Sequence, residues 1–418
     1  MKISHKAHSY YSRLGLCFLT ISVIFITVAT VRFPKDAFDS AMTGLQLWWN
    51  VVFPALLPFF ILSEILMGLG AVHFIGVILE PMMRPLFNVP GAGAFAMSMG
   101  LASGYPMDAV ITARFRQNRL CTAIEAERLL SFTNTADPLF MFGAVAVGMF
   151  GRPELGAIIA LAHYISSVLV GILFRFHGRS QPNSAEAKGV ALSQIPRRAF
   201  RAMVKARRED GRSLSQLLGD SVKISMNTIL LIGGFIILFS VFLRILSVTG
   251  FTDIFTSIFT VLLEITGFST SLAPALVSGF FELDLGAMAA SQADAPLIEK
   301  VAIAGAIIAW SGLCVHGQVA SIVIESGIRM RPYMAGRLLH AVLAAIITMG
   351  LMKLEQLAFS DSTMPVFQHI GMYQGNFTFI DRLEQIGAHF VLFLAVLSIT
   401  GLLFGLGRLA WSKCRAVR

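Results

Sequence analysis

The sequence predicts an all-α integral membrane protein, with about eight transmembrane helices and two re-entrant hairpins arranged as inverted structural repeats with discontinuous helices. Three observations favour this fold class. Of the 418 residues, 56% are hydrophobic and only 14% are charged, whereas about 25% of the residues of soluble domains are charged. Apolar segments long enough to cross a bilayer recur along the chain. The charges of the connecting loops agree with a single orientation.

An α-helix needs about 20 predominantly apolar residues to cross the hydrocarbon core. The segments that meet this requirement are 14–31, 43–66, 129–150, 154–176, 221–246, 299–324, 334–352 and 387–407. Two more apolar segments, 88–109 and 268–290, are interrupted near their midpoints by Gly, Pro or acidic residues, and we expect each to form a re-entrant hairpin. Segments 73–87 and 251–265 are predicted to be amphipathic helices at the membrane interface.

The first apolar segment could be either a cleaved signal peptide or a membrane anchor. Its 18 residues exceed the roughly 7–15 of a signal-peptide core, and no small-residue cleavage site follows it. We therefore expect a retained anchor helix within residues 1–40.

The loop charges define the orientation. Loop 177–217 holds nine Lys and Arg residues against three acids, so it is predicted to be cytoplasmic. Loop 353–385 holds more acids than bases, so it is predicted to lie outside. Eight spans then place both termini in the cytoplasm. Because the net charge of +9 lies in loops that flank apolar spans, it indicates membrane topology and not nucleic-acid binding.

The two halves of the chain share landmarks in one order. Asn50 and Asn227 lie 177 positions apart, and Ser103-Gly104 and Ser278-Gly279 lie 175 positions apart. The predicted topology runs the two halves in opposite directions, so the repeats are inverted. The chain then divides into an N-terminal anchor helix (1–40), membrane repeat 1 (41–176), a basic cytoplasmic linker (177–219), inverted membrane repeat 2 (220–352), and an external loop with a C-terminal helix (353–418).

Backbone that leaves helical pairing inside a bilayer is tolerated only where protein buries it or where it lines a cavity. Four such breaks are predicted, at 103–106, 133–138, 278–282 and 311–312, and they locate the candidate site. The residues predicted to bind solute are Ser103, Gly104, Thr133, Asn134, Thr135, Ser278, Gly279, Ser311 and Gln318. The residues predicted to couple transport to an ion or proton are Asp137, Glu282 and His316. The half-helices that follow the breaks are expected to offer free N–H groups to an anion.

Each break also has a purely structural interpretation. The Ser103–Pro106 turn can be an ordinary Gly/Pro kink, Asp137 can be a helix N-cap, and Glu282 can reach external water. A lone buried histidine such as His316 is more often a hydrogen-bonded packing residue than a ligand. We assign His163 and His340 to packing for the same reason.

Enzyme chemistry is not predicted. The sequence has no HExxH, GxSxG or P-loop motif, and GAGAF at 91–95 follows no strand. Its four cysteines lie far apart without metal-ligand spacing, so we expect free thiols, no metal and no cofactor.

The segments NVPGAGAFAMSMGLASGYPMDA, ERLLSFTNTADPLFMFGAVAVGMF and SGFFELDLGA resemble the sporulation integral membrane proteins of the nucleoside-recognition Gate family. The resemblance covers roughly residues 40 to 350. It implies a transporter of endospore formers in the mother-cell-derived outer forespore membrane, which moves dipicolinic acid, a small dianion, from mother cell toward forespore.

Two alternatives stay open, namely a permease for nucleosides or other polar solutes, and a non-transporting sporulation scaffold that binds partners through the basic linker. The expected partners are a small anionic solute, the lipid bilayer and a coupling cation or proton. The sequence leaves open whether the chain forms a homo-oligomer.

Overall fold

The computed structural model describes residues 20–179, 184 and 194–359, and all regular secondary structure in this part of the chain is helical. A first helix covers Thr20–Arg32. The elements that follow are α2 (Pro34–Leu47), η1 (Trp48–Val52), α3 (Phe53–Gly68), α4 (Ala71–Met82), η2 (Met83–Phe87), α5 (Gly93–Ser103), α6 (Met107–Gln117), α7 (Ala123–Thr133), η3 (Phe140–Met149), α8 (Leu155–Phe174), α9 (Ile195–Asp210), α10 (Leu214–Val248), α11 (Phe251–Thr266), η5 (Thr270–Leu272), α12 (Ala273–Phe281), α13 (Leu283–Gln292), α14 (Leu297–Trp310), α15 (Gly312–Val323), η6 (Ile324–Ser326) and α16 (Met330–Phe359).

Helices with the length and composition of membrane spans account for five of the eight predicted segments. They are Pro34–Gly68, Leu155–Phe174, Leu214–Val248, Leu297–Ser326 and Met330–Leu354. The predicted span 129–150 is not one helix, because α7 ends at Thr133 and η3 begins only at Phe140. The predicted span 14–31 is described only from Thr20 onward, and span 387–407 lies outside the described residues.

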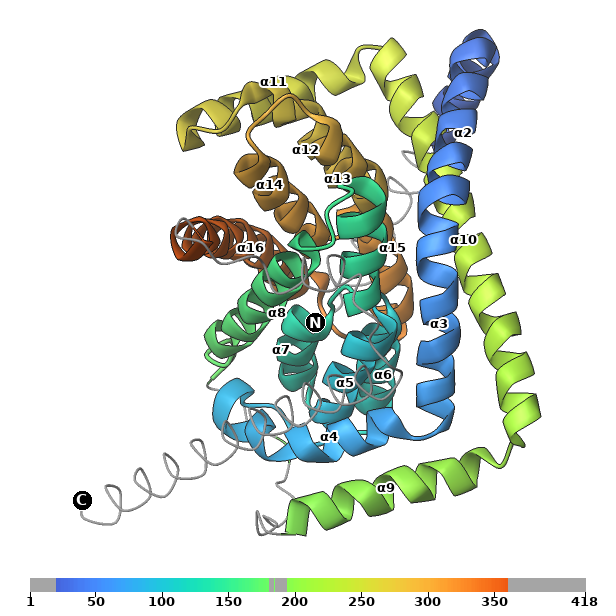
Figure 1. Ribbon diagram of the computed structural model, residues 1–418, viewed down its shortest axis with the longest axis vertical. Helices are drawn as coiled ribbons and strands as arrows, with labels where there is room; N and C mark the ends of the chain where they lie inside the picture. The colour runs from blue at the N-terminus through green and yellow to red at the C-terminus, as the bar shows by residue number, and fades with distance from the viewer. Residues whose placement is uncertain (1–19, 180–183, 185–193, 360–418) are drawn as a thin grey trace, which may run out of the picture.

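The two halves place similar elements at opposite ends of the molecule. Helix α4 lies across one end and α11 lies across the other, while the hairpins α5–α6 and α12–α13 approach the middle from these opposite ends (Figure 1). Segments 73–87 and 251–265 are thus helical and run across the two ends, as the amphipathic pattern predicts. This arrangement is the one expected of inverted repeats.

Two long antiparallel segments flank the hairpins on one side (Figure 1). One is Pro34–Gly68, formed by α2, η1 and α3, and the other is α10. Small residues allow the close contact: a Cβ atom built on Gly44 would lie 2.5 Å from Ser240 Oγ, and one on Gly233 would lie 2.6 Å from the Trp48 ring. The Trp48 indole N–H also donates to the carbonyl of Ile229 at 2.9 Å. Glycine at helix crossings is the usual way in which membrane helices approach each other.

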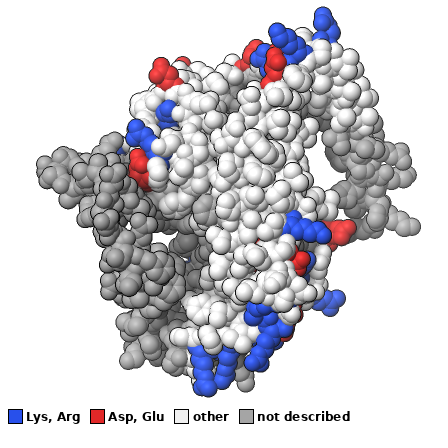
Figure 2. Space-filling model, turned by 45° about the vertical axis from the view of Figure 1, so that its right-hand side comes forward, with Lys and Arg blue, Asp and Glu red and all other residues white. Residues whose placement is uncertain are grey.

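The basic linker contains the helix α9. Helix α9 packs against α4, and Arg198 forms an ion pair of 3.4 Å with Glu80. Its exposed cations follow one stripe at positions 197, 201, 205 and 208. Lys and Arg side chains gather at this end of the molecule (Figure 2).

Glu127 joins three elements at the end of the bundle where α7 begins. The carboxylate accepts hydrogen bonds from Arg329 at 2.6 and 2.8 Å and lies 2.7 Å from His177 Nε2. Its side chain is only 1% exposed. Burial alone would raise the pKa of Glu127, but the hydrogen bonds from Arg329 and His177 outweigh burial and hold this pKa below its usual value.

The substitution Glu127→Gln is therefore expected to lower the free energy of unfolding by about 1–3 kcal/mol at neutral pH. A carboxylate with a lowered pKa stabilises the fold above its usual pKa, and this contribution is lost as the pH falls through the lowered value. The stability difference between wild type and Glu127→Gln should thus shrink as the pH falls below about 4.3. Thermal unfolding in detergent across pH measures it. The exposed Glu209→Gln should change stability by less than about 0.5 kcal/mol, and an equal effect of both variants would contradict this role.

Candidate functional site

Four backbone breaks separate short helices in the middle of the protein. Gly104 ends α5 with a φ of 64°, in the left-handed region that glycine tolerates. A non-helical segment separates Thr133 at the end of α7 from η3. Glu282 lies in extended conformation between α12 and α13, and Ser311, with a φ of 71°, separates α14 from α15. All four predicted breaks are therefore present.

In each half of the chain, the hairpin tip packs against the broken helix. A Cβ atom built on Gly104 would lie 2.9 Å from Asp137 Oδ2, so the first hairpin touches the break after α7. A Cβ atom built on Gly312 would lie 2.8 Å from the carbonyl oxygen of Phe281 and 3.1 Å from Glu282 Cα, so the second hairpin touches the break before α15. The sequence predicted both pairs of breaks but not these contacts.

A buried polar cluster surrounds Asn134. Its amide donates to Asp108 Oδ1 at 2.8 Å, and Thr133 Oγ1 donates to Asp108 Oδ2 at 3.1 Å. On the other side, the Tyr333 hydroxyl donates to Asn134 Oδ1 at 3.2 Å and lies 3.0 Å from His316 Nδ1. All five side chains are buried. The cluster thus connects α6, the break after α7, α15 and α16.

Arg337 lies at the centre of this cluster and is fully buried. Its guanidinium donates to the backbone carbonyls of Asn134 and Ala309, and also to the Tyr105 hydroxyl at 3.2 Å. The guanidinium also lies over the Tyr105 ring, 5.6 Å from its centre. The side chain therefore joins the break after α7 to the break after α14.

The two histidines assigned to packing support the same breaks. His163 Nε2 accepts from the backbone N–H of Ala136 at 3.1 Å, and His340 Nε2 donates to the carbonyl of His163 at 2.9 Å. His340 Nδ1 accepts from Arg337 at 3.1 Å. These bonds agree with a structural role for His163 and His340.

Carboxylates of the chain already occupy two half-helix N-termini. Asp137 Oδ1 accepts from the N–H of Phe140 at 2.8 Å, and Glu282 Oε2 accepts from the N–H of Leu285 at 2.8 Å. The expectation of free N–H groups is therefore wrong at these two ends, and Asp137 is an N-cap. Asp284 Oδ1, close to Glu282, is a buried acceptor without a partner among the described residues.

The other predicted residues divide between the cluster and the periphery. Thr135 and Ser311 are buried at their breaks, whereas Gln318 lies further along α15 and bonds Cys314 at 3.5 Å. Ser103 faces away from the breaks, because its hydroxyl bonds the sulfur of Met67 on α3 at 3.2 Å. Gly279 is buried against Ile307, where a Cβ atom would lie 2.6 Å from that side chain.

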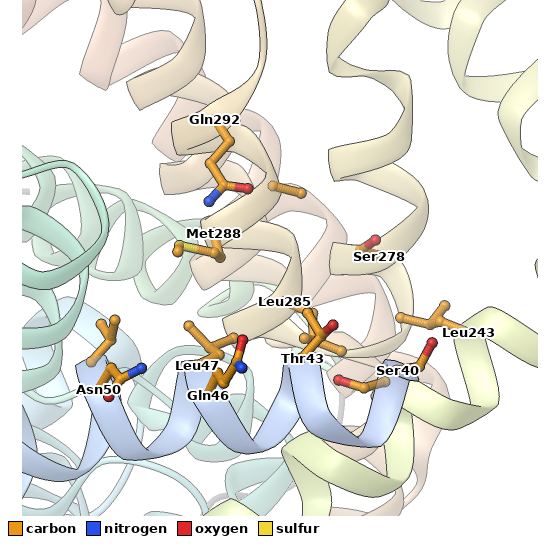
Figure 3. A pocket seen from close by; sticks show the side chains of 13 residues that line it. Ser40, Thr43, Gln46, Leu47, Asn50, Leu243, Ser278, Leu285, Met288 and Gln292 are labelled. Carbon is orange, nitrogen blue, oxygen red and sulfur yellow. The ribbon is translucent and has the colours of Figure 1, made fainter. Parts of the chain in front are cut away.

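Ser278 lines a separate cavity of about 480 Å³, which we call the lateral cavity. The cavity lies between α2, α10 and the second hairpin, and Figure 3 shows Gln46 and Thr43 of α2 opposite Met288 and Gln292 of α13. Its lining residues include three amides, four hydroxyls and no charged side chain; the polar members are Ser40, Thr43, Gln46, Asn50, Ser240, Ser278 and Gln292. The structure thus separates Ser278 from the central cluster.

Sequence reasoning missed Arg337 and Tyr333. The signal for Arg337 was present, because it is the one Lys or Arg within the predicted span 334–352, and an ionisable residue inside a span is a functional candidate by default. Tyr333 gave no comparable signal. Among the residues that the structure describes, no group of three or more His, Cys, Asp or Glu side chains could hold a metal ion.

These features define a multi-span membrane protein of transporter-like fold, in which short half-helices meet at buried breaks. Residues 49–178 match the family model "Gate: Nucleoside recognition". The chain is 42% identical over 379 residues to the sporulation integral membrane protein YlbJ of Bacillus subtilis (strain 168). The match covers 90% of this chain and 93% of that protein. The chain therefore belongs to the YlbJ family of sporulation membrane proteins.

Two solved structures of CNTnw are similar in fold. CNTnw in an inward-facing substrate-bound state has a TM-score of 0.48 and 14% identity, and the match covers 85% of this chain and 88% of that chain. A CNTnw variant in the intermediate 3 state has a TM-score of 0.45 and 11% identity, with 87% and 89% covered.

Proposed function

We propose that the chain transports a small anionic solute across the membrane and that this solute is dipicolinic acid, moved from mother cell toward forespore. The carrying observation is that the tip of the first hairpin and the breaks of both broken helices meet at one buried polar cluster, while the tip of the second hairpin packs against one of these breaks. Unwound backbone inside a membrane protein marks solute and ion sites in secondary transporters. Membership of a sporulation family favours a solute that forespores accumulate.

The cluster also favours an anion. Arg337 places a buried positive charge between the two halves, and its contacts lie beside Asn134 and Tyr105. Within this proposal, Gly104, Thr133, Asn134, Thr135 and Ser311 line the solute path, and Ser278, Gly279 and Gln318 lie on its outer side. Both termini are cytoplasmic, and the membrane is the outer forespore membrane.

Glu282 and Asp284 are proposed as the coupling site, together with Asp137 and His316. Two neighbouring buried carboxyl groups are most stable when they share one proton, because two adjacent negative charges repel each other. We expect Glu282→Gln to remove the response of flux to an imposed proton gradient while leaving some flux. Proteoliposomes with the two sides buffered at different pH measure this response. The control Asp294→Asn changes an exposed acid in the turn after α13, and an unchanged response in Glu282→Gln would argue against coupling at this pair.

A nucleoside or another neutral polar solute is the second candidate, and one observation favours it. The lateral cavity offers the amides of Gln46, Asn50 and Gln292 without any charged side chain. Amides suit the hydrogen-bonding edges of a base, and hydroxyls suit a sugar. This proposal predicts that Gln46→Ala reduces flux of uridine but not of dipicolinate.

The deciding experiment is uptake of labelled dipicolinate and of labelled uridine by proteoliposomes that contain only this protein. Dipicolinate uptake well above that of empty liposomes supports the first candidate, and uridine uptake supports the second. No flux of either solute, together with loss of sporulation function on deleting residues 195–210, would replace both with the scaffold alternative.

A further inference from the structure

The inference concerns the C-terminal ends of the two broken helices, α7 and α14. The last carbonyl groups of a helix have no partner within the helix, and they carry the negative end of the helix dipole. In transporters with broken helices, such carbonyls coordinate the coupling Na⁺. Here the corresponding carbonyls belong to Asn134, which caps α7, and to Ile308 and Ala309 at the end of α14.

Two side chains of the protein, Arg337 and Tyr105, donate hydrogen bonds to these carbonyls. The Arg337 guanidinium donates to the carbonyls of Asn134 and Ala309, one from each broken helix. The Tyr105 hydroxyl donates to the carbonyl of Ile308 at 2.8 Å. Arg337 has no exposed surface, so water cannot replace it without a rearrangement. Its position is therefore that of a cation bound between two helix C-termini.

The charge of Arg337 is balanced locally. Asp108 is fully buried and close enough to Arg337 for an electrostatic interaction, while its two oxygens accept from Asn134 and Thr133. Arginine keeps its charge inside proteins, and its planar fork can bond two separate carbonyls at once. Asp108 and Arg337 thus form one pair of opposite charges, while the Asp137 carboxylate at the same break accepts a hydrogen bond from the N–H of Phe140.

We propose that Arg337 is a built-in replacement for a coupling metal cation, so that this chain moves its solute without Na⁺ or K⁺ at the helix breaks. The inference rests on the proposed function only in assuming that a solute is moved. The position of the guanidinium does not depend on the identity of the solute. The same holds for its expected effect on the response of the protein to Na⁺ and K⁺.

The first test is thermal unfolding of the purified full-length protein in detergent, in chloride salts of Na⁺, K⁺ and choline at equal ionic strength. The wild type should show the same midpoint in all three. Arg337→Ala should unfold roughly 5–10 °C lower in choline. Part of this loss should return with millimolar guanidinium or with Na⁺, because the emptied space keeps two carbonyls and the Asp108 carboxylate.

Controls separate this role from ordinary packing. Arg128 is also buried and also donates to two carbonyls, those of His177 and Asn88, but it lies away from the breaks. Arg128→Ala should lower the midpoint without creating a preference for Na⁺ over choline. If Arg337→Ala does not fold, Arg337→Lys keeps the charge but loses the fork, and it should show a smaller loss that guanidinium does not restore.

The second test is solute flux in proteoliposomes with Na⁺ replaced by choline on both sides. Wild-type dipicolinate flux should stay within about twofold. A wild-type midpoint that rises specifically with Na⁺, or flux that requires Na⁺, would overturn the proposal. Absence of any flux would count against the proposed function instead, and the unfolding series would then decide the present inference alone.

Discussion

Replacing Gly286 with valine is expected to prevent the protein from accumulating in folded form. A Cβ atom at this position would lie 2.2 Å from Gly279 Cα and 2.5 Å from its backbone nitrogen. Both atoms belong to the backbone of α12, so no side-chain rotation can relieve the overlap. Opening the α12–α13 hairpin would cost about 3 kcal/mol or more. The yield of monodisperse protein after detergent extraction measures the effect.

Gly234→Val is the matched control for this variant. Gly234 lies on α10, is exposed, and has nothing within 4 Å of a built Cβ atom. Valine there should leave the yield near that of wild type. A normal yield for Gly286→Val would mean that the second hairpin does not close through the Gly279–Gly286 contact.

Asn134→Ala is expected to reduce dipicolinate flux roughly 100-fold or more. The side-chain amide is the partner of Asp108, and the side-chain oxygen is the partner of Tyr333. Alanine leaves both of these buried groups with fewer hydrogen bonds and removes a polar group from the proposed path. Initial rates in proteoliposomes, normalised to folded protein, give the measurement.

Ser103→Ala is the informative comparison, because the sequence placed Ser103 in the same candidate site. Its hydroxyl bonds the sulfur of Met67, away from the breaks. We expect less than about a threefold change in flux, since a weak bond to sulfur is lost and no buried charge loses its partner. Equal losses in the two variants would show that the cluster around Asn134 has no special role.

The features that were predictable from the sequence are those that composition and local breaks encode. Apolar length predicted the spans, and Gly104, Asn134 and Ser311 were recognisable because polar or helix-breaking residues stand inside apolar segments. Averaging over a span hides single residues, which is why Arg337 was overlooked within 334–352.

Contacts between the two halves could not be predicted in the same way. Tyr105 and Ile308 lie 203 positions apart, and only the folded chain places the tyrosine hydroxyl on that carbonyl. The direction of a side chain on a short helix is equally hidden. Ser278 was placed with the breaks because Gly279 follows it, yet it lines the lateral cavity instead. The capping by Asp137 and Glu282 depends on distances that spacing alone does not determine.

The long antiparallel pair has a consequence for the surrounding lipid. The helical segments Pro34–Gly68 and Leu214–Val248 each contain 35 residues. At about 1.5 Å per residue, each segment is roughly 50 Å long. The hydrocarbon layer is only about 30 Å thick, so the two segments must tilt or extend into the head-group region. Acyl-chain length therefore sets their inclination, and with it the spacing between the two ends of the molecule.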